Sequence, residues 1–178
     1  MQAARVAQLV EHSPCKRAAA GSSPAAGFQP LPPPRTPKEQ GERSERRVIA
    51  ALLDAGYEVL IAPYGENRRY DLVLDLGERF VRVQVKTAHR TRDGAALIAA
   101  TASFAGLGTA RHQIGYRGQI DLFAIYSPDT DRVYLVPVDE CPGTAVQLRL
   151  RPTRNRQRRG VRLASDYELR RWDESAAT

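Results

Sequence analysis

The chain of 178 residues has few cysteines, few aromatic residues and no long hydrophobic run. Its two cysteines, Cys15 and Cys141, have neither CxxC nor metal-ligand spacing, which favours a reducing cytoplasm without disulfides. Aromatic residues make up only 7% of the chain, so a platform for stacked bases is not favoured. The apolar stretch at residues 95–108 is too short to span a membrane, and the N-terminus lacks the apolar core of a secretion signal. We expect a soluble cytoplasmic protein.

The chain carries more positive than negative charge. The formal net charge is +7 and the isoelectric point is about 9.8. A basic balance of this size predicts a polyanionic partner, most simply nucleic acid. The hydrophobic content of 42% is ordinary for a globular protein, and the length suffices for one domain with a core of its own.

Residues 1–36 differ in composition from the rest of the chain. Seven of the twelve prolines fall by residue 37, at positions 14, 24, 30, 32, 33, 34 and 37. Such a segment buries too little to offset its chain entropy, so we expect it to be disordered. Residues 5–17 and 21–27 resemble a conceptual translation of a bacterial tRNA gene, which implies a reading frame opened too far upstream and a native start after residue 30. The folded domain is expected at residues 37–174.

A helix is predicted to begin after Thr36 and to end at Gly56. Thr36, Pro37 and Glu39 form the sequence of a capping box with proline at the first helical position. Glycine is a typical helix stop. Four apolar side chains repeat at helical spacing and predict the buried stripe: Val48, Ile49, Leu52 and Leu53.

A carboxylate falls on this apolar stripe. Glu45 lies one turn before Val48, where a buried carboxylate needs a partner or a metal ion. Glu42, a turn earlier, is a weaker candidate for the same role. The alternative is that Glu45 lies at the edge of the stripe and pairs with a surface arginine.

Residues 70–86 alternate between apolar and polar side chains and predict two strands joined by a two-residue loop at Gly77 and Glu78. This register places Asp71 opposite Gln84. One face of the hairpin is aliphatic, with Leu72, Leu74, Val81, Val83 and Val85. The other carries Asp71, Asp75, Arg82, Gln84 and Lys86, with Val73 and Phe80 among them. A carboxylate, an amide and an ammonium group therefore converge on one surface, unless this face is merely solvated.

The remaining segments predict further strands. Strands are expected at residues 58–62, 95–101, 119–127, 132–138 and 146–151, and residues 122–126 are apolar enough for a buried central strand. Residues 103–118 predict an irregular, glycine-rich loop, either in contact with DNA or only solvated. Ser165 and Asp166 predict the cap of a last helix that extends to Trp172.

Arginines are concentrated near the C-terminus, where residues 146–163 contain seven arginines and no acidic residue. Such a block is a reasonable phosphate contact, although a charge run often only faces solvent. The residues expected to bind nucleic acid are Arg69, Arg90, Arg92, Arg117, Arg154, Arg156, Arg158 and Arg159.

The polar residues of the hairpin suit phosphodiester hydrolysis, which needs an activated water, a neutralised phosphate and a stabilised leaving oxygen. Mg²⁺, or Mn²⁺, supplies much of this and prefers oxygen ligands. Asp71 offers a carboxylate, Gln84 an amide oxygen and Val85 its backbone carbonyl. Glu45 can complete this metal site from the helix. Lys86, on the same face as Gln84, can orient or polarise the attacking water.

The order Glu45, Asp71, Gln84-Val85-Lys86 resembles the PD-(D/E)XK nuclease superfamily, and the wider pattern is similar to the group I intron-associated PD-(D/E)XK endonucleases. The similar motifs are residues 41–45, 69–72, 83–87, 116–121, 133–137, 152–157 and 166–167. The resemblance implies a restriction-endonuclease-like α/β core, with a mixed β-sheet flanked by helices. It also implies a Mg²⁺-dependent endonuclease of homing or mobile-element type that acts on double-stranded DNA as at least a dimer.

Two positions depart from the superfamily pattern. Gln84 replaces an acidic residue, which removes a negative charge from the metal site, yet the intron-associated group tolerates Gln there. Tyr70 stands where proline is usual. Asp121 is expected to cap a strand or hold the basic loop rather than bind metal. The alternatives are another nuclease of the same fold, for restriction, repair or junction resolution, and a catalytically inactive DNA-binding module.

Overall fold

The computed structural model describes residues 36–61, 68–105, 112–141, 143–153 and 159–170. The chain divides into the units Met1–Pro33 and Pro34–Thr178, and every described residue belongs to the second. Residues 1–35 of the predicted leader therefore lie outside the described residues, and Thr36 is the N-cap of α1. None of the described helices is long and apolar enough to cross a membrane.

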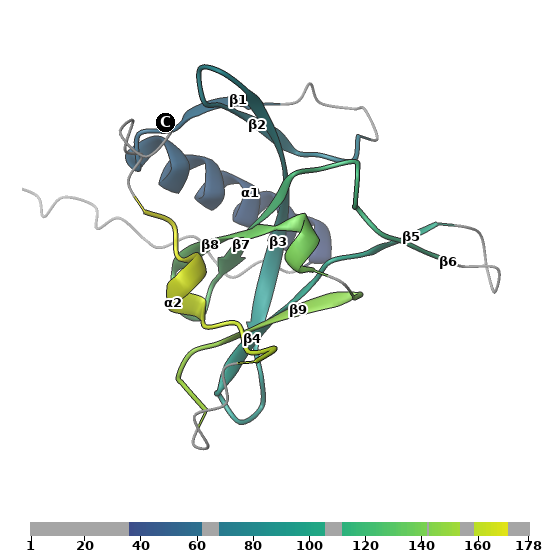
Figure 1. Cartoon of the computed structure of the whole chain (residues 1–178), viewed down its shortest axis with the longest axis vertical. Coiled ribbons are helices and arrows are strands. Elements are labelled where there is room, and N and C mark those ends of the chain that lie inside the picture. Colours follow the sequence, from purple (N-terminus) through teal and green to yellow (C-terminus); the bar gives the residue numbers. More distant parts are fainter. Residues whose placement is uncertain (1–35, 62–67, 106–111, 142, 154–158, 171–178) are drawn as a thin grey trace, which may run out of the picture. The chain divides into compact units, whose positions relative to one another are not determined.

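The described unit combines one long helix with a mixed sheet (Figure 1). Its helices are α1 (Pro37–Asp54), the 3₁₀ turn η1 (Val138–Glu140) and α2 (Ala164–Tyr167). Its first strands are β1 (Glu58–Ile61), β2 (Leu72–Asp75), β3 (Phe80–Arg90) and β4 (Ala96–Ala100). The others are β5 (Ser103–Ala105), β6 (His112–Ile114), β7 (Leu122–Ser127), β8 (Arg132–Pro137) and β9 (Ala145–Arg149).

The predicted start and stop of α1 are confirmed. Thr36 Oγ1 accepts the Glu39 N–H at 3.2 Å, and Glu39 Oε2 accepts the Thr36 N–H at 3.1 Å, so both bonds of the capping box form. Gly56 has a φ of +91°, the left-handed conformation that ends helices.

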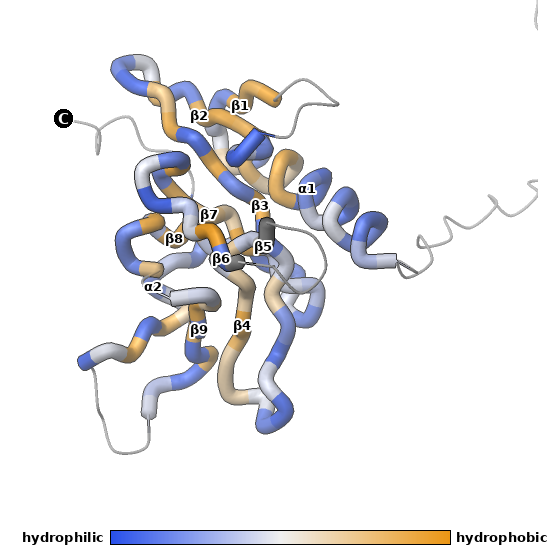
Figure 2. The backbone as a smooth tube through the Cα atoms, turned by 90° about the vertical axis from the view of Figure 1, so that its right-hand side faces the viewer, coloured by the Kyte–Doolittle hydropathy of each residue, from blue (hydrophilic) through white to orange (hydrophobic). Residues whose placement is uncertain are grey.

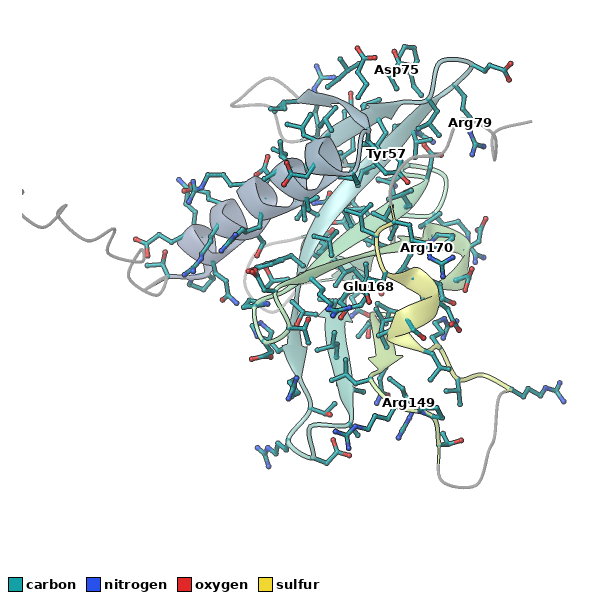
Figure 3. The ribbon with its side chains drawn as sticks, turned by 90° about the vertical axis from the view of Figure 1, so that its left-hand side faces the viewer. Tyr57, Asp75, Arg79, Arg149, Glu168 and Arg170 are labelled. Carbon is teal, nitrogen blue, oxygen red and sulfur yellow. The ribbon has the colours of Figure 1, made fainter. Side chains whose placement is uncertain are left out.

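The predicted hairpin register is also confirmed. Leu72 pairs with Val83, Leu74 with Val81, and the Leu76 N–H donates to the Arg79 carbonyl across the two-residue loop. Gly77 has a φ of +79°, which a residue with a side chain rarely adopts. Asp75 and Arg79 lie at the tip of the hairpin (Figure 3).

The 11-residue strand β3 is the centre of a seven-stranded sheet. β2 and β4 both pair with β3 antiparallel, at opposite ends (Figure 1), and β1 and β9 extend the sheet beyond them. β7 pairs with β3 in parallel, and β8 follows it. The predicted mixed sheet with flanking helices is confirmed.

β2 and β4 share one edge of β3. The Thr91 N–H bonds the Ala96 carbonyl at the start of β4, at 2.8 Å. The neighbouring N–H of Arg90 points to the opposite edge, where it bonds the carboxylate of Asp129 in the β7–β8 turn at 3.0 Å. Successive N–H groups of a strand point to opposite edges, so β4 lies across β3 from β7.

The sheet has an apolar core on each face, and hydrophobic segments, drawn in orange, lie on several strands and on part of α1 (Figure 2). On one face, Val48 and Leu52 of α1 pack on the aliphatic side chains of β2 and β3. On the other, Phe123 and Ile125 of β7 pack with the inner residues of β4 and β9. β7 is buried on both faces, as its apolar sequence predicted.

Three sequence-based expectations were wrong. Leu53 is 54% exposed, because the buried stripe of α1 runs through Ser44, Val48 and Leu52. Residues 103–118 are not wholly irregular, since β5 and β6 form a two-stranded sheet. The last helix is the single turn α2, within which Ser165 and Asp166 lie without capping it; Trp172 falls outside the described residues.

The burial of α1 gives the first prediction. Leu52→Ala should lower the free energy of unfolding by about 2–5 kcal/mol, because Leu52 is fully buried between α1 and the sheet. Leu53→Ala is the matched control on the next residue and should change it by less than about 1 kcal/mol. Urea denaturation measures both. Equal losses would contradict the packing of α1.

Candidate active site

The candidate site lies at a break in the pairing of β3. β2 pairs with β3 as far as Val83, and β4 begins to pair at Ala88. Residues 84–87 of β3 therefore have no strand partner on this edge within the described part of the chain. Backbone groups left open in this way need side chains or ligands to satisfy them.

Asp71 supplies one such partner. Its backbone N–H donates to the Val83 carbonyl at 2.9 Å, which continues the hairpin by one residue. Its side chain then turns along the open edge, where Oδ2 accepts the Val85 N–H at 2.7 Å. The same oxygen accepts a short hydrogen bond from Gln84 Nε2. The carboxylate thus takes the place of a missing strand.

The first turns of α1 cover this open edge. Gly41, Ser44 and Glu45 of the helix line one pocket of about 310 Å³ together with five residues of the hairpin: Asp71, Gln84, Val85, Lys86 and Thr87. The buried hydroxyl of Ser44 lies 2.6 Å from that of Thr87 and fixes the helix to the strand. This bond places Glu45 beside Asp71.

The carboxylates of Glu45 and Asp71 line the same pocket, and the charge of Asp71 opposes the ionisation of Glu45. Burial raises the pKa of Glu45 above its usual value, and the nearby Asp71 and Glu42 raise it further, against a smaller opposing effect of Arg46. Burial also raises the pKa of Asp71, although the hydrogen bond from Val85, the charge of Lys86 and the bond from Gln84 offset part of the rise. A cation between the carboxylates would relieve this repulsion.

The donor set of the pocket fits a hard divalent cation. Within the residues that the structure describes, no three His, Cys, Asp or Glu side chains gather as a metal site. The predicted ligand set contains only two carboxylates, those of Asp71 and Glu45, and the amide of Gln84 and the carbonyl of Val85 are its other oxygen donors. Oxygen-only sets of this kind suit Mg²⁺ and Mn²⁺. The assignment of these ligands stays a prediction.

Lys86 extends from β3 to the edge of the pocket. Its ammonium donates a hydrogen bond of 3.1 Å to the hydroxyl of Tyr116 and lies 4.9 Å from the centre of that ring. Its positive charge helps to hold the pKa of Asp71 down. The structure therefore brings Glu45, Asp71, Gln84 and Lys86 together around one pocket.

Asp121 lies outside this pocket, in agreement with its omission from the predicted metal ligands. Its carboxylate accepts the backbone N–H of Arg82 at 2.7 Å and forms an ion pair with the Arg82 guanidinium at 3.1 Å. These hydrogen bonds lower the pKa of Asp121. Asp121 thus caps the start of β7 against β3.

The arginines predicted to bind nucleic acid differ in their exposure and in their contacts within the protein. Arg90 and Arg92 are accessible at the β3–β4 turn, and Arg117 is exposed although it forms an ion pair with Asp139 at 3.1 Å. Arg69 is half-buried and donates to Gln119, Ser103 and two backbone carbonyls. Arg159 is exposed. Arg154, Arg156 and Arg158 fall outside the described residues.

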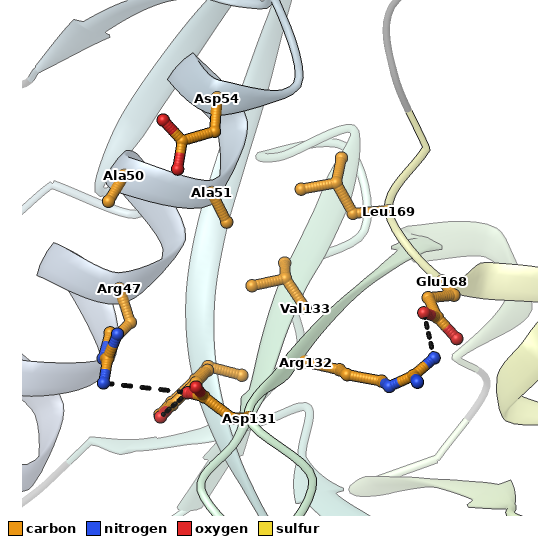
Figure 4. Close-up of a pocket in the computed structure, with 10 residues that line it drawn as sticks. Arg47, Ala50, Ala51, Asp54, Asp131, Arg132, Val133, Glu168 and Leu169 are labelled. Carbon is orange, nitrogen blue, oxygen red and sulfur yellow. Dashed lines mark hydrogen bonds and ion pairs between the residues drawn. The ribbon is translucent and has the colours of Figure 1, made fainter.

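A second pocket, of about 270 Å³, lies between α1, β8 and the segment after α2 (Figure 4). Arg47 and Asp131 approach within 3.9 Å at one side, and Arg132 pairs with Glu168 at the other. It shares no lining residue with the Asp71 pocket. Its charged groups link α1 and β8 to the C-terminal segment, and we assign it no chemistry.

The mixed sheet of this protein, with an acid, an amide and a lysine gathered around an open strand edge, has the restriction-endonuclease-like fold. The profile of the PD-(D/E)XK endonuclease family matches residues 35–170, and the chain belongs to this family. A solved structure of a bacterial homing endonuclease, I-Ssp6803I, is similar, with a TM-score of 0.61 and 25% sequence identity over 75% of this chain and 88% of that chain. No curated protein gave a significant match.

Two residues that shape the site were not predicted from the sequence. Ser44 precedes Glu45 and joins α1 to β3. Tyr116 holds the ammonium of Lys86. The available signal for Ser44 was a polar residue one turn before Val48, at the N-terminal end of the buried stripe, and the motif at residues 116–121 was the signal for Tyr116.

The raised pKa of Glu45 gives the second prediction. Because the folded state binds this proton more tightly than the unfolded state, protonation stabilises the fold at low pH, and this stabilisation is lost as the pH rises through the raised pKa. Glu45→Gln should therefore raise the free energy of unfolding at pH ~7 in the presence of EDTA. The gain should stay below about 1 kcal/mol, since solvent screens this half-exposed group.

The control for this measurement is Glu78→Gln, which removes an exposed carboxylate in the loop at the far tip of the hairpin. Urea denaturation at pH ~7 and pH ~4 should show a gain for Glu45→Gln that shrinks at the lower pH, and little change for the control. A loss of stability in Glu45→Gln at neutral pH would contradict the repulsion between Glu45 and Asp71.

Proposed function

We propose that this PD-(D/E)XK endonuclease is a Mg²⁺-dependent DNA endonuclease of homing or mobile-element type. The observation that carries the proposal is the open edge of β3, where Asp71, Gln84 and Lys86 meet Glu45 of α1 in one pocket. The similarity to a homing endonuclease supports the homing type. The resemblance of the sequence to intron-associated endonucleases supports it further.

Mg²⁺ would be held by Asp71, Gln84 and the Val85 carbonyl, with Glu45 as a further ligand or as a partner of a bound water. When bound, the ion supplies neutralisation of the phosphate charge and a lowered pKa for water. Gln84 Nε2 bonds Asp71, so the amide plane is fixed and its oxygen stays available. Lys86 presents the remaining N–H groups of its ammonium to the attacking water or the scissile phosphate.

The proposed substrate is double-stranded DNA, which the basic balance of the chain favours. A cut in both strands requires one active site for each strand, so we propose that the enzyme acts as a dimer or a higher homo-oligomer. The exposed arginines and the arginine-rich residues 154–159 are the proposed phosphate contacts.

The third prediction concerns cleavage. Lys86→Ala and Asp71→Asn should slow Mg²⁺-dependent cutting by at least about a hundredfold, because each removes a charged group from the reacting centre. Their DNA affinity should stay close to that of the parent. The measurement is linearisation of supercoiled plasmid that carries an uninterrupted tRNA locus, with Mg²⁺, with Mn²⁺ and with EDTA.

Asp75→Asn is the matched control, since it removes a carboxylate from the same hairpin at its far end, where Asp75 bonds the Gly77 N–H at 2.8 Å (Figure 3). It should cut like the parent. DNA binding by the parent without cutting in either metal would instead support a DNA-binding module inactivated at Gln84. Preference for branched DNA would support a junction-resolving nuclease.

The fourth prediction concerns the arginine-rich segment. Replacing Arg154 and Arg156 together with Gln should weaken DNA binding about equally for all sequences and reduce the salt slope of the affinity by about two. The control pair is Arg79→Gln with Arg170→Gln, two exposed arginines elsewhere on the domain (Figure 3). Fluorescence anisotropy over a range of salt concentrations measures both. An unchanged slope for the first pair would show that this segment only faces solvent.

A further inference from the structure

The position of Lys86 depends on two residues outside the predicted catalytic and metal-binding set. We propose that Tyr116, held in turn by Arg69, is a positioning residue that sets the ammonium of Lys86 at the pocket. The inference rests on the proposed cleavage at the Asp71 pocket for its functional part. Its structural part, the hydrogen bond from Lys86 to Tyr116, stands on the geometry alone.

The ring of Tyr116 is fixed on several sides. It is 6% exposed and packs edge-on against Phe123, with ring centres 5.4 Å apart and an interplanar angle of 82°. The Gln119 N–H donates to the Tyr116 carbonyl at 2.9 Å in a tight turn, which fixes the backbone. The hydroxyl therefore has a defined place, and Lys86 donates to it at 3.1 Å.

The guanidinium of Arg69 lies 4.0 Å from the centre of the same ring, within the range of a cation–π contact. It also donates to Ser103 Oγ at 2.6 Å and to the Gly115 carbonyl at 2.8 Å. Ser103 begins β5, and Gly115 follows β6. Because Ser103 pairs with Ile114, both contacts lie at one end of the β5–β6 sheet, and Arg69 ties this end to the ring that holds Lys86.

This arrangement explains how Lys86 is held at the pocket although it forms no ion pair with a carboxylate of the described residues. A flexible four-carbon side chain loses rotamer freedom when it is held in place, and a hydrogen bond to a rigid phenol fixes it while leaving its other N–H groups for the substrate. A shift of about 1 Å at a reacting group can cost about a hundredfold in rate. A fixed Tyr116 prevents such a shift.

The first test measures Lys86 without any need for cleavage. The chain has three lysines, and exposed Lys38 is an internal reference. Brief acetylation followed by peptide mass spectrometry gives the ratio of labelling at Lys86 to that at Lys38. Tyr116→Phe should raise this ratio several-fold, because it deletes only the acceptor of the ammonium.

The matched control is Tyr134→Phe, which removes another buried tyrosine hydroxyl, 3.2 Å from Thr130 and outside the pocket. It should leave the labelling ratio unchanged. An unchanged ratio in Tyr116→Phe would overturn the proposal.

The second test follows single-turnover cleavage of DNA with Mg²⁺. Tyr116→Phe should slow cleavage about tenfold or more with unchanged DNA affinity, and Tyr134→Phe should cut like the parent. Cutting by Tyr116→Phe at the parent's rate would overturn the positioning role. If the parent fails to cut, the proposed function is rejected. The labelling ratio still tests the hydrogen bond between Lys86 and Tyr116 in that case.

Arg69 is tested by the salt dependence of DNA binding. Arg69→Gln should slow cleavage while the salt slope of the affinity stays as in the parent, because its guanidinium is used within the protein. Arg117→Gln is the control at an exposed arginine. A salt slope reduced by about one in Arg69→Gln would show a phosphate contact instead and would remove Arg69 from the network.

Discussion

The unpaired edge of β3 is the constraint on which the site depends. A β-sheet normally satisfies its backbone groups by pairing strands, but residues 84–87 lie between the ends of β2 and β4. The N–H of Val85 must find another acceptor, and the carboxylate of Asp71 provides it. The contacts from Val85 and Gln84 both fall on Oδ2 of Asp71, so among the described residues the other oxygen is left for a ligand. The hydrogen bond from the Val85 N–H to Asp71 thus satisfies the open strand edge and also orients the Asp71 carboxylate.

The neutral side chain of Gln84 fits the electrostatics of this pocket. Glu45 and Asp71 already have raised pKa values, so a third carboxylate would add to their repulsion in the absence of a cation. An amide can instead donate to Asp71 and still offer an oxygen. The cost is a weaker attraction for a divalent cation, since one negative charge is missing. The neutral amide therefore adds no further repulsion to the two carboxylates whose pKa values are already raised.

The parts of the fold that were predictable depend on local sequence. Alternation at residues 70–86 and the Gly77 turn together fix the hairpin register, and this register places Asp71 opposite Gln84. The failures involve long-range contacts. Leu53 has the spacing of a core residue, but its side chain is 54% exposed because it lies beside the buried stripe of Ser44, Val48 and Leu52. The contacts of Arg69 were also not predictable, because its partners at Ser103, Gly115 and Gln119 are distant in sequence; its contact with DNA stays a prediction. The spacing of charged residues along the chain does not show which of them bind partners within the folded protein.

Three charged groups of the pocket are each held by a different partner, and all three arrangements meet on β3. Ser44 bonds Thr87 and so places Glu45; Asp71 bonds Val85 directly. Lys86 is held by Tyr116. Because β3 is also paired with β2, β4 and β7, it is the most constrained strand of the sheet, and a site built on it loses little when single surface contacts change. Burial also raises the pKa values of Asp71 and Glu45, so the packing that positions these two carboxylates also favours their protonated forms.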